Sequence, residues 1–216
     1  MINIFNRMYL DRTAASAAEF AMVLPLLLIF ILGIIDVGRL LYTWNEAEKA
    51  TQMGVRFAVV TNIVATDLQS HDFTTNGIGL GDPVTTSVFQ HAECVSGNCP
   101  KAQCVGSACS SFDADLGYSD TNFAKVVSQM VPFLPLITAE NVQIDYDSAD
   151  VTSASGGVNL GYVSDPGGLS LSPLVTVRLK DLTFSPILFT IFGGSITLPD
   201  FKATLPMEDG SGIYSN

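Results

Sequence analysis

Residues 14–44 of the chain read AASAAEFAMVLPLLLIFILGIIDVGRLLYTW, and this stretch decides the fold. Glu19 is the only ionisable residue from Ala14 to Ile35. An α-helix over these residues would be roughly 33 Å long at about 1.5 Å per residue, enough to cross a bilayer core of ~30 Å. Three interpretations compete: a cleaved secretory signal, a buried core helix and a retained membrane anchor.

Two features favour the anchor. A secretory signal ends in a small-residue cleavage site, whereas this apolar run leads into Asp36 and Arg39. The core helix of a soluble protein carries a polar stripe, and none interrupts Phe20–Ile35. The sequence therefore predicts a leader-like tail over residues 1–14 and a transmembrane helix over residues 15–36.

The flanking charges predict the orientation of this helix. The tail carries Arg7 and Arg12 against a single acidic residue, Asp11. Because positive residues near a span stay on the cytoplasmic side, we expect the tail in the cytoplasm and the rest of the chain on the exported side.

The composition excludes several functions. The chain has 216 residues and a formal net charge of −11, and it has no Lys/Arg cluster that could bind nucleic acid. It contains no G-x-S-x-G, H-E-x-x-H, P-loop or dinucleotide fingerprint, so we expect no enzyme activity, no small-molecule substrate and no cofactor. His71 and His91 are the only histidines, and they are interpreted as surface residues without a catalytic or metal-binding role.

Beyond the membrane the helical period continues, which predicts an exported continuation of the same helix over residues 37–66. Ala50, Gly54 and Ala58 form a ladder of small residues on this continuation. Such a ladder lets another backbone approach closely. Its partner is either the chain's own sheet or another subunit.

All four cysteines lie in one short segment, where Cys94 and Cys99 are echoed at the same spacing by Cys104 and Cys109. Zinc sites favour tighter pairs, and an exported domain meets an oxidising environment, so we expect disulfides in the loop 94–109 and no metal. The echo favours Cys94–Cys99 and Cys104–Cys109. The nested pairing, Cys94–Cys109 around Cys99–Cys104, stays open.

The rest of the exported part, residues 67–206, reads as one α+β domain followed by a flexible tail over 207–216. Asp113–Asp120 is interpreted as a solvated loop because its carboxylates lack the spacing of a calcium loop. A short helix is expected over Thr121–Val131, capped by Asp120. Ser185 and Pro186 are placed as the cap and first position of an apolar turn. Strands are expected at 141–146, 157–163, 174–180, 195–198 and 201–205.

The N-terminus resembles that of type IV pilins and pseudopilins, in which a short basic leader and small residues precede a glutamate and an apolar helix. This resemblance implies cleavage by a prepilin peptidase between Ala14 and Ala15. Ala14 stands where that family usually has glycine. The resemblance also implies that Glu19 pairs with the amino terminus of a neighbouring subunit. The alternative is that Glu19 lies near the membrane interface and its side chain snorkels to water.

Arg12–Val60 resembles more narrowly the TadE-like proteins of the tight-adherence (Tad/Flp) pilus system. The shared features are Glu-Phe, the Leu-Pro-Leu core, an acidic residue followed by Gly-Arg, and a Gly-x-Arg-x-Ala helix end. The resemblance implies a pilin-like α+β fold, in which a long N-terminal helix carries a mainly antiparallel sheet on its exported half.

The same resemblance implies a minor pilin or pseudopilin that acts as a structural component in pilus assembly for adherence. It implies a single-pass protein of the bacterial inner membrane with a periplasmic domain, able to enter a pilus. The partners implied are other pilus subunits, Tad assembly-platform proteins and, if the leader is cut, a prepilin peptidase. The alternative is a membrane-anchored binding module that presents the disulfide-stabilised loop.

Overall fold

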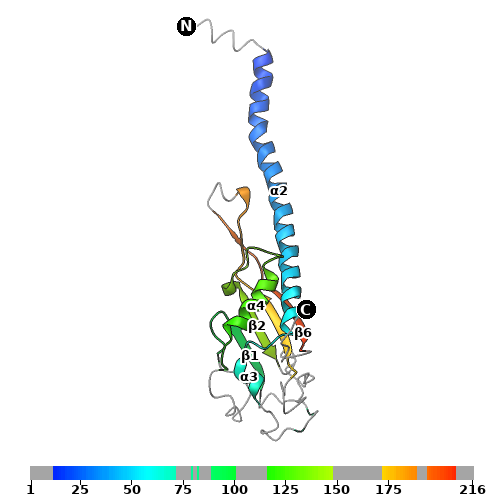
Figure 1. Ribbon diagram of the computed structural model, residues 1–216. Helices are drawn as coiled ribbons and strands as arrows, with labels where there is room; N and C mark the ends of the chain where they lie inside the picture. Colours follow the sequence, from blue (N-terminus) through cyan, green and yellow to red (C-terminus); the bar gives the residue numbers. More distant parts are fainter. Residues whose placement is uncertain are drawn as a thin grey trace. The chain divides into compact units, whose positions relative to one another are not determined.

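The computed structural model describes residues 12–71, 79, 82, 89–100, 116–147, 172–188 and 194–207. The chain divides into two compact units. The first contains Met1–Thr43 and Thr183–Ile196, and the second contains Trp44–Leu182 and Thr197–Asn216. One long helix, α2 (Arg12–Ala58), runs through both units and is coloured blue to cyan in Figure 1.

Helix α2 is 47 residues long and continues through Pro25. It is the one helix of the described residues that is long and apolar enough to cross a membrane, which fits single-pass anchoring. The residue limits of the span itself, 15–36, stay a prediction.

The helix ends at Ala58, so the expected continuation to residue 66 is wrong. The last turn tightens, because the Val60 N–H donates to the Phe57 carbonyl instead of the carbonyl four residues back. The chain then turns so that Ile63 and Ala65 become fully buried. No glycine or proline stands at the end of this helix to stop it. We therefore attribute its end to the burial of the residues that follow.

The second unit contains an antiparallel four-stranded sheet in the order β1-β2-β3-β6. Its strands are β1 (His91–Val95), β2 (Val142–Asp147), β3 (Leu174–Leu179) and β6 (Phe201–Pro206). Two short strands, β4 (Thr183–Phe184) and β5 (Ile196–Thr197), pair separately. The predicted α+β class with a long N-terminal helix and an antiparallel sheet is confirmed.

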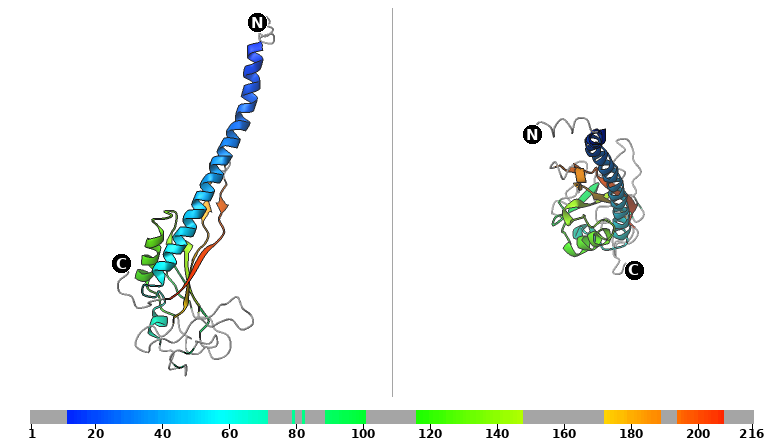
Figure 2. Two further views of the ribbon diagram at one scale, coloured as in Figure 1. Left: turned by 90° about the vertical axis from the view of Figure 1, so that its right-hand side faces the viewer. Right: turned by 90° about the horizontal axis from the view of Figure 1, so that it is seen from above.

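One face of the four-stranded sheet is apolar and forms the core of the second unit. Ile144, Val177 and Leu179 are fully buried on this face. Helix α4 (Asp120–Met130) and the cyan end of α2 cover it, as the views in Figures 1 and 2 show together. The alternation of side chains along β2 and β3 therefore places every second residue against a helix.

Helix α4 buries Phe123, Val126 and Met130, as its spacing predicts. Its cap differs from the expectation: the side chain of Ser119 accepts a hydrogen bond from the Asn122 N–H at 3.3 Å, whereas Asp120 is the first helical residue. Ser119 is therefore the N-cap, and Asp120 contributes its charge to the first turn.

Two short helices complete the described second unit, α3 (Thr66–Ser70) and the 3-10 helix η3 (Ala139–Asn141). Other expectations lie outside the described residues: the strand over 157–163, the loop part 113–115, the tail 208–216 and the pair Cys104–Cys109.

Candidate assembly surface and neighbouring sites

The N-terminal half of α2 exposes its apolar side chains. Met22 is 83% exposed and Leu26 is 73% exposed, and every side chain from Ser16 to Ile31 is classed as exposed. Leaving so many apolar side chains in water would be unfavourable at about 25 cal/mol for each Å². This surface therefore fits a membrane or the helices of other subunits.

Glu19 is the one charged side chain on this surface from Ser16 to Ile35, and it is exposed. Within the described part of the chain, no hydrogen bond or ion pair reaches its carboxylate. Ala14 and Ala15, the residues expected to flank the processing site, lie in the same helix. The described residues thus supply an apolar helix with an exposed carboxylate and no partner for it.

Asp36 has a different environment from Glu19. Its carboxylate accepts hydrogen bonds from the backbone N–H groups of Ile187 at 2.8 Å and Leu188 at 2.9 Å, and Arg39 lies 3.3 Å away. Arg39 also stacks over the ring of Phe184, 5.4 Å from its centroid. Asp36 is only 7% exposed, so its carboxylate is buried by these contacts.

The ladder of small residues packs within the second unit. Ala50 and Ala58 are buried, and a Cβ atom placed on Gly54 would lie 2.7 Å from Met130 Sδ and 3.3 Å from a methyl group of Val177. Of the two alternatives left open by the sequence, the structure therefore shows packing against the chain's own helix α4 and sheet.

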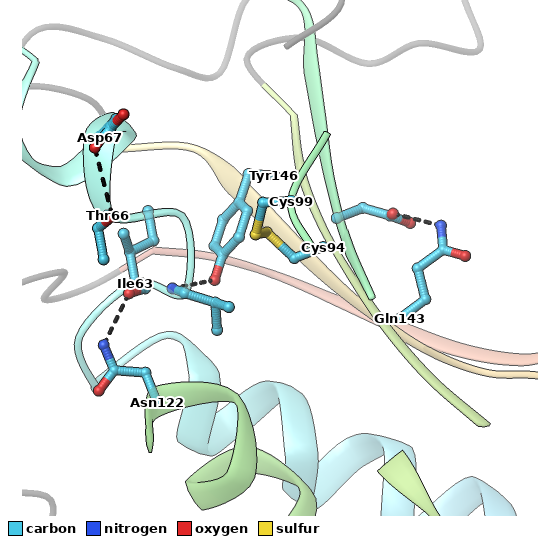
Figure 3. The surroundings of a disulfide bond; sticks show 10 residues. Ile63, Thr66, Asp67, Cys94, Cys99, Asn122, Gln143 and Tyr146 are labelled. Carbon is cyan, nitrogen blue, oxygen red and sulfur yellow. Dashed lines mark hydrogen bonds between the residues drawn. A yellow bond between two sulfur atoms is a disulfide. The ribbon is translucent and has the colours of Figure 1, made fainter. Parts of the chain in front are cut away.

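A disulfide joins Cys94 and Cys99, which is the first of the two local pairs that the cysteine echo favours. The bond closes the turn that follows β1, and Figure 3 shows it close to the ring of Tyr146. The hydroxyl of Tyr146 accepts a hydrogen bond from the Val64 N–H at 3.0 Å. Burial is the main reason why the pKa of Tyr146 is raised, so it stays neutral.

The other face of the sheet carries a polar network that the sequence analysis missed. Asp145 is fully buried, and Arg178 donates to its Oδ2 at 2.5 Å while Gln143 donates to its Oδ1 at 2.7 Å. Lys180 in turn donates to Gln143 Oε1 at 2.7 Å. Alternation along β2 places Gln143 and Asp145 on one face, but their partners become visible only once the strand register is known.

His91 lies beside this network and is not a plain surface residue. Its Nδ1 is 2.6 Å from Asp147 Oδ1, and its side chain is 18% exposed. The hydrogen bond to Asp147 raises the pKa of His91, and the charges of Asp147, Asp145 and Glu93 add to this effect while burial opposes it. The pair therefore favours the protonated imidazole.

Three groups near this point could approach a cation together. Ligand atoms of His91, Glu93 and Asp145 lie within 4.8 Å of one another. Both oxygens of Asp145 already accept hydrogen bonds from Arg178 and Gln143, and Arg178 brings a positive charge to the same carboxylate. The described geometry thus fits an ion-pair network better than a metal centre.

Comparison with known protein families gives one match. The family model described as TadE-like protein matches residues 14–56. This match confirms the resemblance predicted from Arg12–Val60. It covers most of α2, including Glu19, Ala50 and Gly54, whereas Ala58 lies outside it. No curated protein and no solved structure matches the chain significantly.

Proposed function

We propose that this protein is a membrane-anchored structural component in the assembly of a Tad/Flp-type pilus, where it acts as a minor pilin or pseudopilin. The observation that carries the proposal is the coincidence of the TadE-like match over residues 14–56 with an exposed apolar helix that contains Glu19. A helix used only as an anchor gains nothing from a carboxylate inside its apolar run, because ionisable residues in membrane segments are unfavourable without a partner.

In this proposal, the carboxylate of Glu19 pairs with an amino terminus. Cleavage between Ala14 and Ala15 would place the new ammonium group four residues before Glu19. The amino terminus of a neighbouring subunit then neutralises Glu19 inside the membrane, so the charge favours subunit association over an isolated helix.

The proposal also assigns a location and partners. The protein lies in the bacterial inner membrane with its N-terminus in the cytoplasm and its sheet domain in the periplasm. It associates with other pilus subunits and Tad assembly-platform proteins for adherence, and can enter the pilus. It has no catalytic step, cofactor, small-molecule substrate or nucleic-acid partner.

A helix exchange tests this function. Residues 15–35 are replaced by an unrelated apolar membrane span of the same length, and pilus formation is measured in cells that lack the native protein. An assembly component whose helix makes specific contacts loses pilus formation, although the chimera reaches the membrane at the normal level. Normal pilus formation by the chimera would contradict the proposal.

Processing has its own prediction. The mass of the purified mature chain should correspond to an N-terminus at Ala15, because the resemblance places the cut after Ala14. The variant Ala14→Lys should stay at full length if a peptidase reads this position. A wild-type chain that keeps Met1 in cells with an active prepilin peptidase would contradict the predicted processing.

The alternative function, a binding module on a tether, has one observation in its favour. The turn Ser96–Asn98 is exposed, follows the edge strand β1, and is closed by the Cys94–Cys99 disulfide. A tethered module would tolerate the helix exchange and would lose binding to its surface when this turn is replaced. The same chimera therefore distinguishes the two functions.

A further inference from the structure

A second apolar surface lies beside the outer end of the predicted span, within the first unit. We call it the apolar tip, and it is built from Pro186, Ile187, Leu188 and Ile196. Ile187 and Ile196 are its exposed residues, Leu188 is half-buried and Pro186 is buried. Ile187 and Ile196 are each 37% exposed, although both are large aliphatic side chains. The tip lies against α2 from Gly33 to Leu40, where the two segments line an apolar pocket of about 170 Å³.

The contact between Leu188 and Gly33 shows which turn of α2 the tip lies beside. The Cδ1 atom of Leu188 lies 3.8 Å from the position that a Cβ on Gly33 would occupy. Gly33 belongs to the last turn of the predicted span, residues 15–36. If that turn is in the membrane, Leu188 is at the same depth.

The backbone N–H groups of the tip at residues 186–188 need no hydrogen bond from water. Pro186 has no N–H group, and the N–H groups of Ile187 and Leu188 both donate to the carboxylate of Asp36. A non-helical segment can lie at membrane depth only when the protein satisfies its polar groups in this way. The contact also covers Asp36, which would otherwise present a bare charge at the end of the span.

The surface around the tip continues the apolar surface of the span. Val37 is 57% exposed and Leu41 is 58% exposed, so apolar side chains extend past Asp36 on the helix as well. The side chain of Arg39 is 48% exposed and its guanidinium stacks on Phe184. Arginine near the end of a membrane span commonly keeps its charge at the lipid headgroups. Continuity with the span favours lipid over a protein partner as the occupant of this surface.

We propose that the apolar tip inserts into the outer leaflet beside α2 and gives the chain a second contact with the lipid bilayer. The inference rests on the proposed anchoring by α2. Asp36 has a double role in it, because its carboxylate satisfies the backbone of the tip and is itself shielded from lipid.

Tryptophan fluorescence in vesicles tests this insertion. The chain has a single tryptophan, Trp44, which is replaced by phenylalanine in the full-length protein. Ile187→Trp then reports on the tip, Leu27→Trp on the span, and Gln52→Trp on an exposed site farther along the same helix. The proteins are reconstituted at low density in phosphatidylcholine–phosphatidylglycerol vesicles with or without brominated acyl chains, which quench a tryptophan in contact with them.

The expected result is that brominated lipid quenches Ile187→Trp nearly as strongly as Leu27→Trp, whereas Gln52→Trp keeps its intensity. Ile196→Trp should behave like Ile187→Trp and replaces it if that variant does not fold. Quenching of Leu27→Trp without quenching at either tip position overturns the inference and leaves the anchor intact. A blue-shifted but unquenched tip would mean that protein covers it, which also overturns the inference. An unquenched Leu27→Trp would refute the anchor and the inference together.

Discussion

The pair formed by His91 and Asp147 couples the sheet to pH. Their side chains lie 2.6 Å apart across β1 and β2, which are paired in register at this point. Glu93, Asp145, Arg178 and Lys202 are charged groups of the same sheet face, and Lys180 joins this network through Gln143. The hydrogen bond with Asp147, supported by the neighbouring carboxylates, raises the pKa of His91.

This pair predicts a loss of stability at high pH. Because the folded pKa of His91 lies above the unfolded value of about 6.5, the charged pair stabilises the fold fully below that value and loses its effect as the pH rises through the folded pKa. The free energy of unfolding in detergent should therefore fall as the pH rises from the unfolded pKa of about 6.5 through the raised folded pKa. His91→Gln and Asp147→Asn should both flatten this dependence. Equal slopes in all three proteins would contradict the role of the pair.

Gly54 is a position at which α2 packs closely against the rest of the second unit. A side chain there would collide with Met130 and press on Val177, so Gly54→Leu should reduce the free energy of unfolding by about 3 kcal/mol, as overpacking of a filled core does. Gln52→Leu, an exposed position two residues earlier, is the control and should change stability by less than ~0.5 kcal/mol. Chemical denaturation of the full chain in detergent measures both. A stable Gly54→Leu variant would show that the ladder is not tightly packed.

At the scale of elements, the sequence predicts those structures whose signals are local. The apolar run predicts α2, and the alternation of residues predicts β2, β3 and β6 to within one residue. The sequence does not predict strand β1, because its residues HAECV include few of the β-branched and aromatic residues typical of strands. The two faces of this strand become clear only from its pairing with β2.

The end of α2 and the role of Asp36 could not be predicted for the same physical reason. Ile63 and Ala65 are buried in a core whose strands come later in the sequence. The helix therefore ends without a local stop signal that the sequence could reveal. The N–H groups bound by Asp36 belong to residues 151 and 152 positions away. Ser185 was the predicted cap of that turn, and no local pattern points to a distant carboxylate instead.

The disulfide is an element-scale constraint with a measurable effect. Cys94 and Cys99 are five positions apart, and closing so short a loop stabilises a domain by about 2 kcal/mol in the chain-entropy model. Replacing both by alanine should lower the free energy of unfolding by about that amount while leaving membrane insertion unchanged. Cys94 and Cys99 should also resist alkylation in exported protein until a reductant is added. Labelling of both without reductant would contradict the bond in the cell.

At the scale of the whole molecule, the chain combines a helix that exposes its apolar surface with a domain that buries its own. The ladder of small residues is used inside the second unit, where Gly54 packs on Met130 and Val177, so it is not available to another subunit. The N-terminal half of α2 is the surface that the proposed function uses, and Glu19 is its single charged group from Ser16 to Ile35. The proposed function therefore depends on one side chain more than on any other.

The substitution Glu19→Leu tests this dependence most directly. It removes a charge from an apolar membrane segment, where charged side chains are unfavourable, so the variant should enter the membrane at least as well as the wild type. Met22→Leu, an apolar exchange at an exposed position on the same half of the helix, is the matched control. The quantity measured is the amount of protein that co-purifies with crosslinked Tad pilus components, at equal levels in the membrane. The account predicts that Glu19→Leu is lost from this complex while Met22→Leu is retained, and recovery of Glu19→Leu at the wild-type level would contradict it.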